Sequence, residues 1–455
     1  MRYSNYLYIF ILLWMPVYAC KKASFLHAKP DNSLLIPSSP QDCQRLLDDD
    51  RVMNGFGNAG YPCMPEIGSD DYYIDSTQFD MYSSASQQAA IWARDIPTGD
   101  ESPDWDLPYR VVLTANGVLE ALTVMTAGNQ LSTLNSIKGA AFFFRAYAFY
   151  SLAEVFCQAY DSSTSVTDEG LPLRLSTDVN ERLSRATVQQ TYDQILSDLR
   201  AARSLLSKDS NWLPTRPSLA AVYGLFARIF LSARNYSQAL RYADSCLQLR
   251  PALMRYDTLS KTSLFPFNRW NPEVIFSAAY FSSGPAATYR SHTDSLLFRS
   301  YQPNDLRKDL FFKYGDYFFG RYDQDGYCFS GIATDEIYLI RSECLARAGN
   351  INAAMTDLNH LLETRWAAGT FTPYIAIDAD DALQQILQER RKELIYRGLR
   401  WSDLRRLNKN DRTAHTLTRM VEGILYTLPP NDPRWVLPIP GYVLSFNPGM
   451  PQNTR

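Results

Sequence analysis

Two segments of this chain repeat one pattern of small and polar residues. Each starts with a small residue and continues with an asparagine and then an alanine, in the segments 227–239 and 342–354. Small residues at this spacing let two antiparallel helices pack closely on either side of a turn. Pro251 follows the first copy, and a proline ends a helix because it lacks a backbone N–H. The repetition therefore predicts a scaffold of helical hairpins.

The offsets of the small residue, the alanine and the proline are similar to those of the roughly 34-residue tetratricopeptide repeat. A generic helical hairpin remains the alternative. Apolar residues at intervals of three and four predict two further helices over 108–127 and 137–156. Thr187 can cap another helix that reaches Leu205. The chain should therefore be mostly α-helical.

Two stretches lack helical periodicity and are rich in aromatic and turn residues. The first runs from Cys43 to Trp105 and the second from Tyr256 to Cys328. Within the second, the residues Asn271 to Phe276 predict a short strand. Loops carried by a rigid scaffold supply most binding residues, so we expect the function to lie in these two stretches.

The segment Gln388 to Leu407 is dense in charge and has apolar residues close to a helical period, which predicts one long helix. Glu393 and Arg397 stand four apart, and Arg400 and Asp403 three apart. Side chains at these spacings meet on one helix face. Physical chemistry alone favours a solvated amphipathic helix with ion pairs along its surface.

The residue order of this segment, E-R-x-x-E-L-x-x-x-G-x-R-x-x-D-L-x-R, resembles the C-terminal signature of the SusD/RagB-like family. These are surface lipoproteins of Bacteroidetes-type bacteria that bind nutrients, mostly glycans. Arg397 stands where the family has an acidic residue. The closing segments 435–440 and 447–453 are also similar to those of the family. The resemblance implies a mostly α, SusD-like scaffold of tetratricopeptide-like hairpins with a large loop-rich, minor-β binding region.

The resemblance extends through the body of the chain. Tyr301-x-x-x-Asp305-x-Arg307 is similar to a family motif, and we expect Asp305 and Arg307 to form a structural ion pair. The predicted parts are a signal peptide (1–19), a lipidated tether (20–42), an N-terminal SusD-like part (43–255, with the loop-rich stretch 43–105), an irregular ligand-facing insert (256–330) and a C-terminal SusD-like part (331–455).

The N-terminus reads as an export signal. Arg2 precedes an apolar run from Tyr8 to Val17, which is shorter than the about 20 residues needed to cross a bilayer. Ala19 and Cys20 follow, and a cysteine directly after the cleavage point is similar to a lipobox. Cys20 is then the lipid-modified first residue of the mature chain. The alternative is an ordinary signal peptide with an incidental cysteine, and the membrane leaflet stays open.

The remaining cysteines do not predict a metal site. None of the six forms a CxxC or another zinc-binding spacing. Cys43 and Cys63 flank a loop-rich stretch, and an exported chain permits disulfides, so a bridge between them stays open. The formal net charge of −3 argues against a nucleic-acid-binding role.

Candidate ligand-binding residues are aromatic, because a flat ring can stack on the weakly apolar C–H face of a sugar. We select Trp92, Tyr280 and Tyr289, with Asp71 and Tyr73 as polar support. Asp, Asn or Arg side chains nearby can bind the sugar hydroxyls in directional hydrogen bonds. The family's ligand loops vary, so the resemblance does not fix these positions.

No P-loop, dinucleotide-binding, metalloprotease or hydrolase motif is present, so the sequence predicts no catalytic residue, no metal and no cofactor. The resemblance implies a non-catalytic lipoprotein, anchored in the outer membrane and facing the cell surface, that passes oligosaccharide to a SusC-like TonB-dependent transporter. The alternatives are a helical-repeat scaffold or peptide-binding lipoprotein, and a glycan hydrolase. The sequence does not name the glycan.

Overall fold

Helices form most of the protein, as the apolar periodicity predicts. The computed structural model describes residues 37–455, except 58–59, 98, 100, 127–129, 209–212, 281–282, 288–289 and 323–326. The predicted signal peptide, the lipid-carrying Cys20 and the candidate Tyr289 lie outside these residues. Within them, no helix is both long and apolar enough to cross a membrane. The predicted boundaries between the parts of the chain stay predictions.

The elements follow the chain order. The helices of the first half are α3 (Pro40–Leu47), α4 (Asp50–Met53), α5 (Met64–Gly68), α6 (Ser76–Asp80), α7 (Ser84–Ala90), α8 (Pro103–Thr123), α9 (Leu131–Phe156), α10 (Val188–Leu205), α11 (Leu219–Ser232) and α12 (Tyr236–Leu249). Those of the second half are α13 (Ser295–Ser300), α14 (Arg307–Phe311), α15 (Thr334–Arg347), α16 (Ile351–Glu363), α17 (Ala379–Glu393), α18 (Arg400–Leu407) and α19 (Gly441–Phe446).

The strands are short and pair two by two, all antiparallel. They are β1 (Tyr72–Tyr73) with β4 (His292–Thr293), β2 (Val274–Phe276) with β8 (Ile332–Ala333), β3 (Ala279–Tyr280) with β7 (Cys328–Phe329), β5 (Phe312–Lys313) with β6 (Tyr317–Phe318), and β9 (Leu417–Val421) with β10 (Ile424–Leu428). The strand predicted from Asn271 to Phe276 is confirmed as β2.

The predicted helices of the N-terminal part are confirmed, with shifted starts. Pro103 begins α8 and occupies a first-turn position, where a missing N–H costs no intrahelical bond. Pro108, the predicted start, lies inside that helix. Thr187 caps α10 through a capping box with Gln190, in which each side chain bonds the other residue's backbone N–H.

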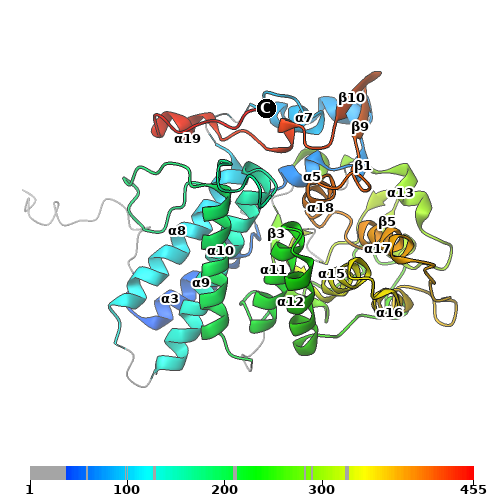
Figure 1. Cartoon of the computed structure of the whole chain (residues 1–455), viewed down its shortest axis with the longest axis horizontal. Coiled ribbons are helices and arrows are strands. Elements are labelled where there is room, and N and C mark those ends of the chain that lie inside the picture. Colours follow the sequence, from blue (N-terminus) through cyan, green and yellow to red (C-terminus); the bar gives the residue numbers. More distant parts are fainter. Residues whose placement is uncertain are drawn as a thin grey trace, which may run out of the picture. The chain divides into compact units, whose positions relative to one another are not determined.

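Both copies of the repeated motif fold as helical hairpins, α11 with α12 and α15 with α16 (Figure 1). The small residues allow the close approach that the sequence predicts. The Ser342 hydroxyl of α15 donates to the Ala354 carbonyl of α16 over 2.8 Å, and the Cys246 thiol of α12 donates to the Ala220 carbonyl of α11 over 3.3 Å. The hairpins pack in series, because α12 also contacts α15.

The prediction of one helix over Gln388–Leu407 is wrong. The chain leaves α17 after Glu393 and enters α18 at Arg400, through left-handed backbone at Tyr396 (φ +55°) and Gly398 (φ +70°). Left-handed residues end a helix because they turn its hydrogen-bond ladder aside. α17 packs beside the second hairpin, whereas α18 packs against α5 and α11 and reaches α15 through the Arg406–Glu343 ion pair.

The two predicted ion pairs are also wrong, because Glu393, Arg397 and Arg400 have partners outside this segment and Asp403 pairs with Arg390 and Arg406 instead. Glu393 accepts from Arg307 and Arg365, and Arg397 donates to Asp335. Arg400 binds Asp70 with two hydrogen bonds. These side chains are largely buried rather than solvated. Tertiary partners therefore replaced the local pairs that sequence spacing favoured.

The expected pair of Asp305 and Arg307 is confirmed and belongs to a larger buried cluster of charge. Arg307 binds Asp305 at 2.7 Å, Glu389 at 2.6 Å and Glu393 at 3.0 Å, and its side chain is fully buried. Burial alone would raise the pKa of the Asp305 carboxyl, but Arg307 and Lys392 hold it below its ordinary value. On the other side of Glu393, Arg365 binds Glu273 with two hydrogen bonds.

Several clusters of apolar side chains, rather than one, form the interior. The largest joins the helices from α8 to α12 with the strands of the second irregular stretch. A second lies among α15, α16 and α17, and a third packs Trp92, Trp401 and Trp435 under the β9–β10 hairpin. Cys43 and Cys63 are both buried free thiols, so the bridge left open by the sequence is not formed.

The buried charge cluster predicts a large loss of stability from one substitution. Glu393→Ala removes the carboxylate that Arg307 and Arg365 share and leaves one buried donor of each guanidinium without an acceptor, which costs about 1–3 kcal/mol per donor. We expect this fall in the free energy of unfolding, measured by urea denaturation. Arg412→Ala is the control, because the Arg412–Asp380 pair is 81% and 71% exposed and should contribute less than about 1 kcal/mol. Equal effects of the two changes would contradict a structural role for the cluster.

Candidate functional site

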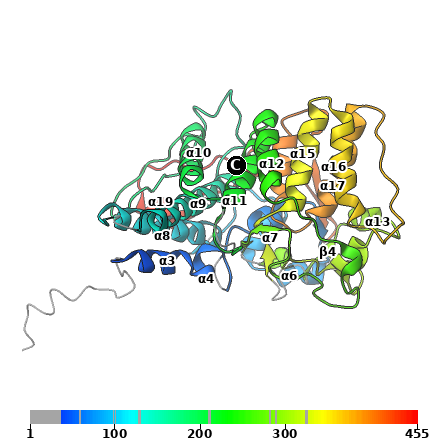
Figure 2. The same cartoon turned by 90° about the horizontal axis from the view of Figure 1, so that it is seen from below.

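The two irregular stretches meet in space. β1 of the first stretch pairs with β4 of the second, with Tyr73 opposite His292. A second bridge joins Tyr61 to Tyr280. Figure 2 shows α6, α7 and β4 on the same side of the repeat helices α12, α15 and α16. Residues that are more than 200 positions apart in the chain therefore form one surface region.

Two of the candidate ligand residues are buried in the structure. Trp92 is 2% exposed, donates its indole N–H to the Gly68 carbonyl over 2.9 Å and lies under the Arg419 guanidinium. Tyr280 is 1% exposed and donates its hydroxyl to the Tyr396 carbonyl. Both rings pack in the interior, so contact with a ligand would require their neighbours to move. Their role in binding stays a prediction.

Asp71 is buried as well, and its carboxylate forms an ion pair. Its carboxylate lies 3.0 Å from Arg391 of α17, while the neighbouring Asp70 binds Arg400 of α18. Burial raises the pKa of Asp71 to about 6, although Arg391 acts in the opposite direction. These bonds hold the segment before β1 against the two C-terminal helices. Asp71 therefore supports the position of Tyr73 rather than reaching the surface itself.

Tyr73 is the selected residue that the structure places at the surface, 42% exposed. Its ring stacks on His292 with 4.9 Å between ring centroids and a 12° interplanar angle. His292 in turn lies 4.6 Å from the Tyr317 ring. Asp316 joins them, because it lies 2.7 Å from Nδ1 of His292 and accepts from the Tyr73 hydroxyl over 3.3 Å.

Further aromatic side chains follow along the β5–β6 hairpin. Tyr317 and Phe319 share one face of extended backbone, and the intervening Phe318 is buried. Phe319 packs against Tyr314 with 6.0 Å between ring centroids. Tyr314 is 80% exposed and has left-handed backbone, φ +52°, which is unfavourable for a bulky residue. We name this surface, formed by Tyr73, His292, Tyr317, Phe319 and Tyr314, the aromatic ridge.

Carboxylates border the ridge. Asp316 is partly buried beneath it, and Asp75 is 47% exposed with an oxygen 4.0 Å from Nε2 of His292. The pKa of Asp75 lies below its ordinary value. The largest cause is a hydrogen bond from the Thr77 hydroxyl, and His292 contributes less. Both carboxylates are hydrogen-bond acceptors beside flat rings. Such an arrangement can bind a ligand with an apolar face and hydroxyl groups on its edge.

Sequence reasoning did not select His292, Asp316 or Tyr317 as site residues. The four histidines are scattered along the sequence, and no sequence pattern connects residue 292 to residue 73. The long-range register of β1 and β4 creates the contact. A usable signal was the density of tyrosines between 314 and 327 in a stretch without helical period, which marks the region but not the individual residues.

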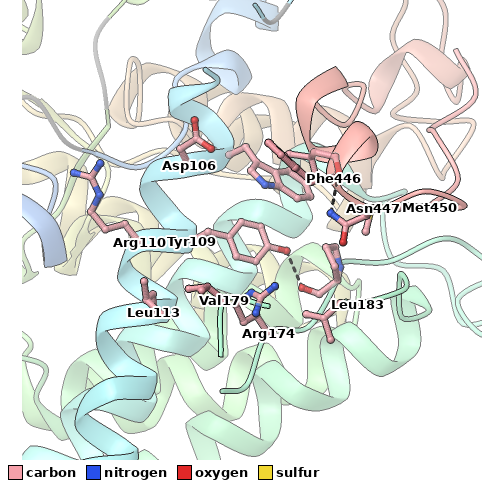
Figure 3. A pocket seen from close by; sticks show the side chains of 13 residues that line it. Asp106, Tyr109, Arg110, Leu113, Arg174, Val179, Leu183, Phe446, Asn447 and Met450 are labelled. Atoms are coloured by element: carbon pink, nitrogen blue, oxygen red, sulfur yellow. Dashed lines mark hydrogen bonds between the residues drawn. The ribbon is translucent and has the colours of Figure 1, made fainter. Parts of the chain in front are cut away.

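A separate pocket of about 420 Å³ lies between α8, the loop around Arg174 and α19 (Figure 3). Trp105 and Tyr109 of α8 line this pocket, and Trp105 also packs edge-on to Phe156. The Tyr109 hydroxyl donates to the Pro172 carbonyl over 2.9 Å. Phe446, 76% exposed, forms another wall. The lining is mostly apolar, unlike the ridge.

No grouping of histidine, cysteine, aspartate and glutamate suited to a metal ion occurs among the residues that the structure describes. Fold and surface together define a scaffold of helical hairpins that carries an irregular, aromatic surface.

Two family models match the sequence. Residues 24–231 match the family described as "Starch-binding associating with outer membrane", and residues 334–455 match the SusD family. The chain belongs to the SusD family. No functionally curated protein matches the chain.

Solved structures share the fold. A SusD superfamily protein from Bacteroides thetaiotaomicron is 20% identical, with a TM-score of 0.75, and the match covers 92% of this chain and 100% of that one. A SusD superfamily protein from Bacteroides fragilis is 20% identical, with a TM-score of 0.74 and coverage of 91% and 100%. A SusD-like carbohydrate-binding protein from Bacteroides vulgatus is 21% identical, with a TM-score of 0.68 and coverage of 91% and 98%.

The segment before the ridge predicts a pH dependence of stability. Burial, followed by the charges of Asp71 and Asp70, raises the pKa of Glu66 to about 8. The folded protein then keeps a proton that the unfolded chain releases above about pH 4.5. Stability should therefore fall as the pH rises from about 4.5 to 8, by on the order of a few kcal/mol.

Glu66→Gln cannot release this proton, so the variant should gain stability relative to the native protein between pH 5 and pH 8.5. Melting temperatures of both proteins at the two pH values measure the difference. A constant difference between the two proteins across this range would show that Glu66 titrates normally.

Proposed function

We propose that this protein is a non-catalytic outer-membrane lipoprotein that binds oligosaccharide on the aromatic ridge and passes it to a SusC-like TonB-dependent transporter. The observation that carries the proposal is the stacked pair of Tyr73 and His292, with the tilted Tyr317 ring beside it and Asp316 bound to both members of the pair. Membership of the SusD family supports the ligand class and the association with the outer membrane.

Sugar recognition follows from the chemistry of the ridge. The C–H face of a pyranose can lie on the exposed part of Tyr73, because a flat ring offers apolar area at little entropic cost. Sugar hydroxyls at the edge can donate to Asp75 and Asp316, and such charge-assisted hydrogen bonds are directional. Successive rings from Tyr73 to Tyr314 suit an extended oligosaccharide better than a single sugar.

Moderate affinity suits the proposed transfer to a transporter, because a captured oligosaccharide must be released again. The ridge is an open surface rather than an enclosed cavity, which allows a long glycan to extend beyond it. The partly exposed rings contribute area, while the partly buried Asp316 fixes orientation. The lipid anchor at Cys20, facing the cell surface, would hold this surface near the transporter.

Removal of a ridge ring should weaken glycan binding. Tyr73→Ala deletes the stacking surface, and loss of one such contact corresponds to an about three- to tenfold rise in Kd. Tyr314→Asn deletes the outermost ring and replaces it with a residue that tolerates left-handed backbone, so stability should not fall. Calorimetry and retardation gels with a panel of glycans measure the affinities.

Phe446→Ala is the matched control for this experiment. Phe446 is an exposed aromatic residue on α19, in the pocket of Figure 3 and not on the ridge. We expect unchanged glycan affinity in this variant. Loss of binding in Phe446→Ala, with normal binding in Tyr73→Ala, would move the site to that pocket. Binding of peptides and of no glycan would favour a peptide-binding lipoprotein.

The anchor is tested separately. Cys20→Ala removes the thiol that would carry the lipid, and the buried acyl chains supply membrane affinity of about 0.8 kcal/mol per methylene group. The variant should move from the membrane fraction to the soluble fraction, and the mass of the mature protein should lose the acyl groups. An unchanged distribution would indicate an ordinary signal peptide.

A further inference from the structure

The two repeat copies end their first helices in the same way but with different residues. Asn235 N–H donates to the Phe230 carbonyl over 2.8 Å in the first copy, and Asn350 N–H to the Leu345 carbonyl over 2.9 Å in the second. In both copies the residue before the asparagine has left-handed backbone. This is the Schellman arrangement, in which that position is usually glycine.

The second copy has the expected glycine and the first does not. Gly349 has φ +79°, and a Cβ added there would meet nothing within 4 Å. Backbone preference, rather than lack of space, therefore favours glycine at this turn. Arg234 adopts φ +60° at the same position of the first copy, where a Cβ-bearing residue is strained. Because the backbone favours glycine at this position, we look to the arginine side chain to explain its presence.

The Arg234 side chain lines a cavity of about 530 Å³ between α10 and the α11–α12 hairpin. Nη2 lies 3.2 Å from the Asp161 carboxylate. Nη1 is buried and has no hydrogen-bond partner among the described residues. A buried donor without a partner is costly, and a bound acceptor would remove that cost. Strain and an unused donor thus occur together at one pocket.

Aromatic and polar groups form the other walls. The rings of Tyr160 and Tyr192 lie 4.9 Å apart, and Tyr236 lines the cavity from the start of α12. The Tyr160 hydroxyl donates to the Gln189 side chain over 2.8 Å. Flat rings beside amide and hydroxyl groups suit a ligand with an apolar face and several hydroxyls.

We propose that this cavity is a second binding site, which takes a single neutral sugar residue. After a rotation of the Arg234 guanidinium toward the cavity, Nη1 would donate to one sugar hydroxyl, and Asp161, which lies beside Arg234, would accept from a neighbouring hydroxyl. A neutral ligand is favoured over an anion, because Asp161 already balances the charge of Arg234. The inference takes its ligand class from the proposed function, but the site lies on the repeat scaffold and shares no residue with the aromatic ridge.

Arg234→Gly tests the proposal. The substitution removes the donor and gives the turn the residue of the second copy, so the melting temperature should stay the same or rise. We expect saturation-transfer NMR on the mature protein to detect binding of D-glucose, D-galactose or D-mannose. For the sugar that binds, Arg234→Gly should raise Kd about tenfold or more, as expected for loss of a hydrogen bond from a charged group.

Gly349→Arg is the matched control, because it places the same side chain on the second turn, where an added Cβ meets nothing within 4 Å. It should lower the melting temperature and leave sugar binding unchanged. Unchanged monosaccharide binding in Arg234→Gly would overturn the inference, and so would the absence of binding by all three sugars.

The Tyr73→Ala variant separates this inference from the proposed function. Monosaccharide binding lost in Tyr73→Ala but kept in Arg234→Gly would place the sugar on the ridge, which overturns the second site and leaves the proposed function intact. Arg234-dependent monosaccharide binding, in a protein whose affinity for the glycan panel does not depend on Tyr73, would support the second site and overturn the ridge.

Discussion

The buried pairing of Arg307 with three carboxylates determines how distant parts of this chain fit together. A guanidinium without contact to water is stable only if acceptors surround it, because its desolvation is otherwise not offset. Asp305 comes from the irregular insert, and Glu389 and Glu393 come from α17. Glu393 also binds Arg365, which in turn binds Glu273 before β2. One chain of charges thus fixes the insert, the second hairpin and α17 against one another.

The position of the aromatic ridge also depends on ion pairs between arginines and carboxylates, nearer to the surface. Arg391 and Arg400 hold Asp71 and Asp70, and the chain continues directly from these aspartates into β1 and Tyr73. Tyr73 can then meet His292 of the insert, which the charge cluster has already positioned on the scaffold. The segment Gln388 to Leu407 therefore affects this surface indirectly. Its Arg391 and Arg400 bind the aspartates before Tyr73, and these bonds position the surface that we propose for binding.

Local patterns predicted the helices well because their information is local. The apolar period and the Thr187 cap act within one or two turns, and the small residues at the hairpin contact are only twelve positions apart. The same logic failed between Glu393 and Arg400, where partners far along the chain outweighed neighbours three or four residues away. It also selected Trp92 and Tyr280 for being aromatic in loop-rich sequence, although both are buried in the structure. Burial and strand register are long-range properties, so a single sequence could mark the ligand-facing region without identifying Tyr317 or His292.

Left-handed backbone at residues other than glycine offers a way to separate structural from functional side chains in this fold. Trp92 and Tyr396 have positive φ but are buried, so their packing accounts for the strain. Glu422 stands in the two-residue turn between β9 and β10, where both positions require positive φ. Tyr314 and Arg234 differ from these residues. Tyr314 projects into solvent, and Arg234 stands where the second copy of the repeat has glycine. A turn accounts for the left-handed backbone of both residues, but glycine would suit each position better, so the choice of these two side chains is what binding a ligand would explain.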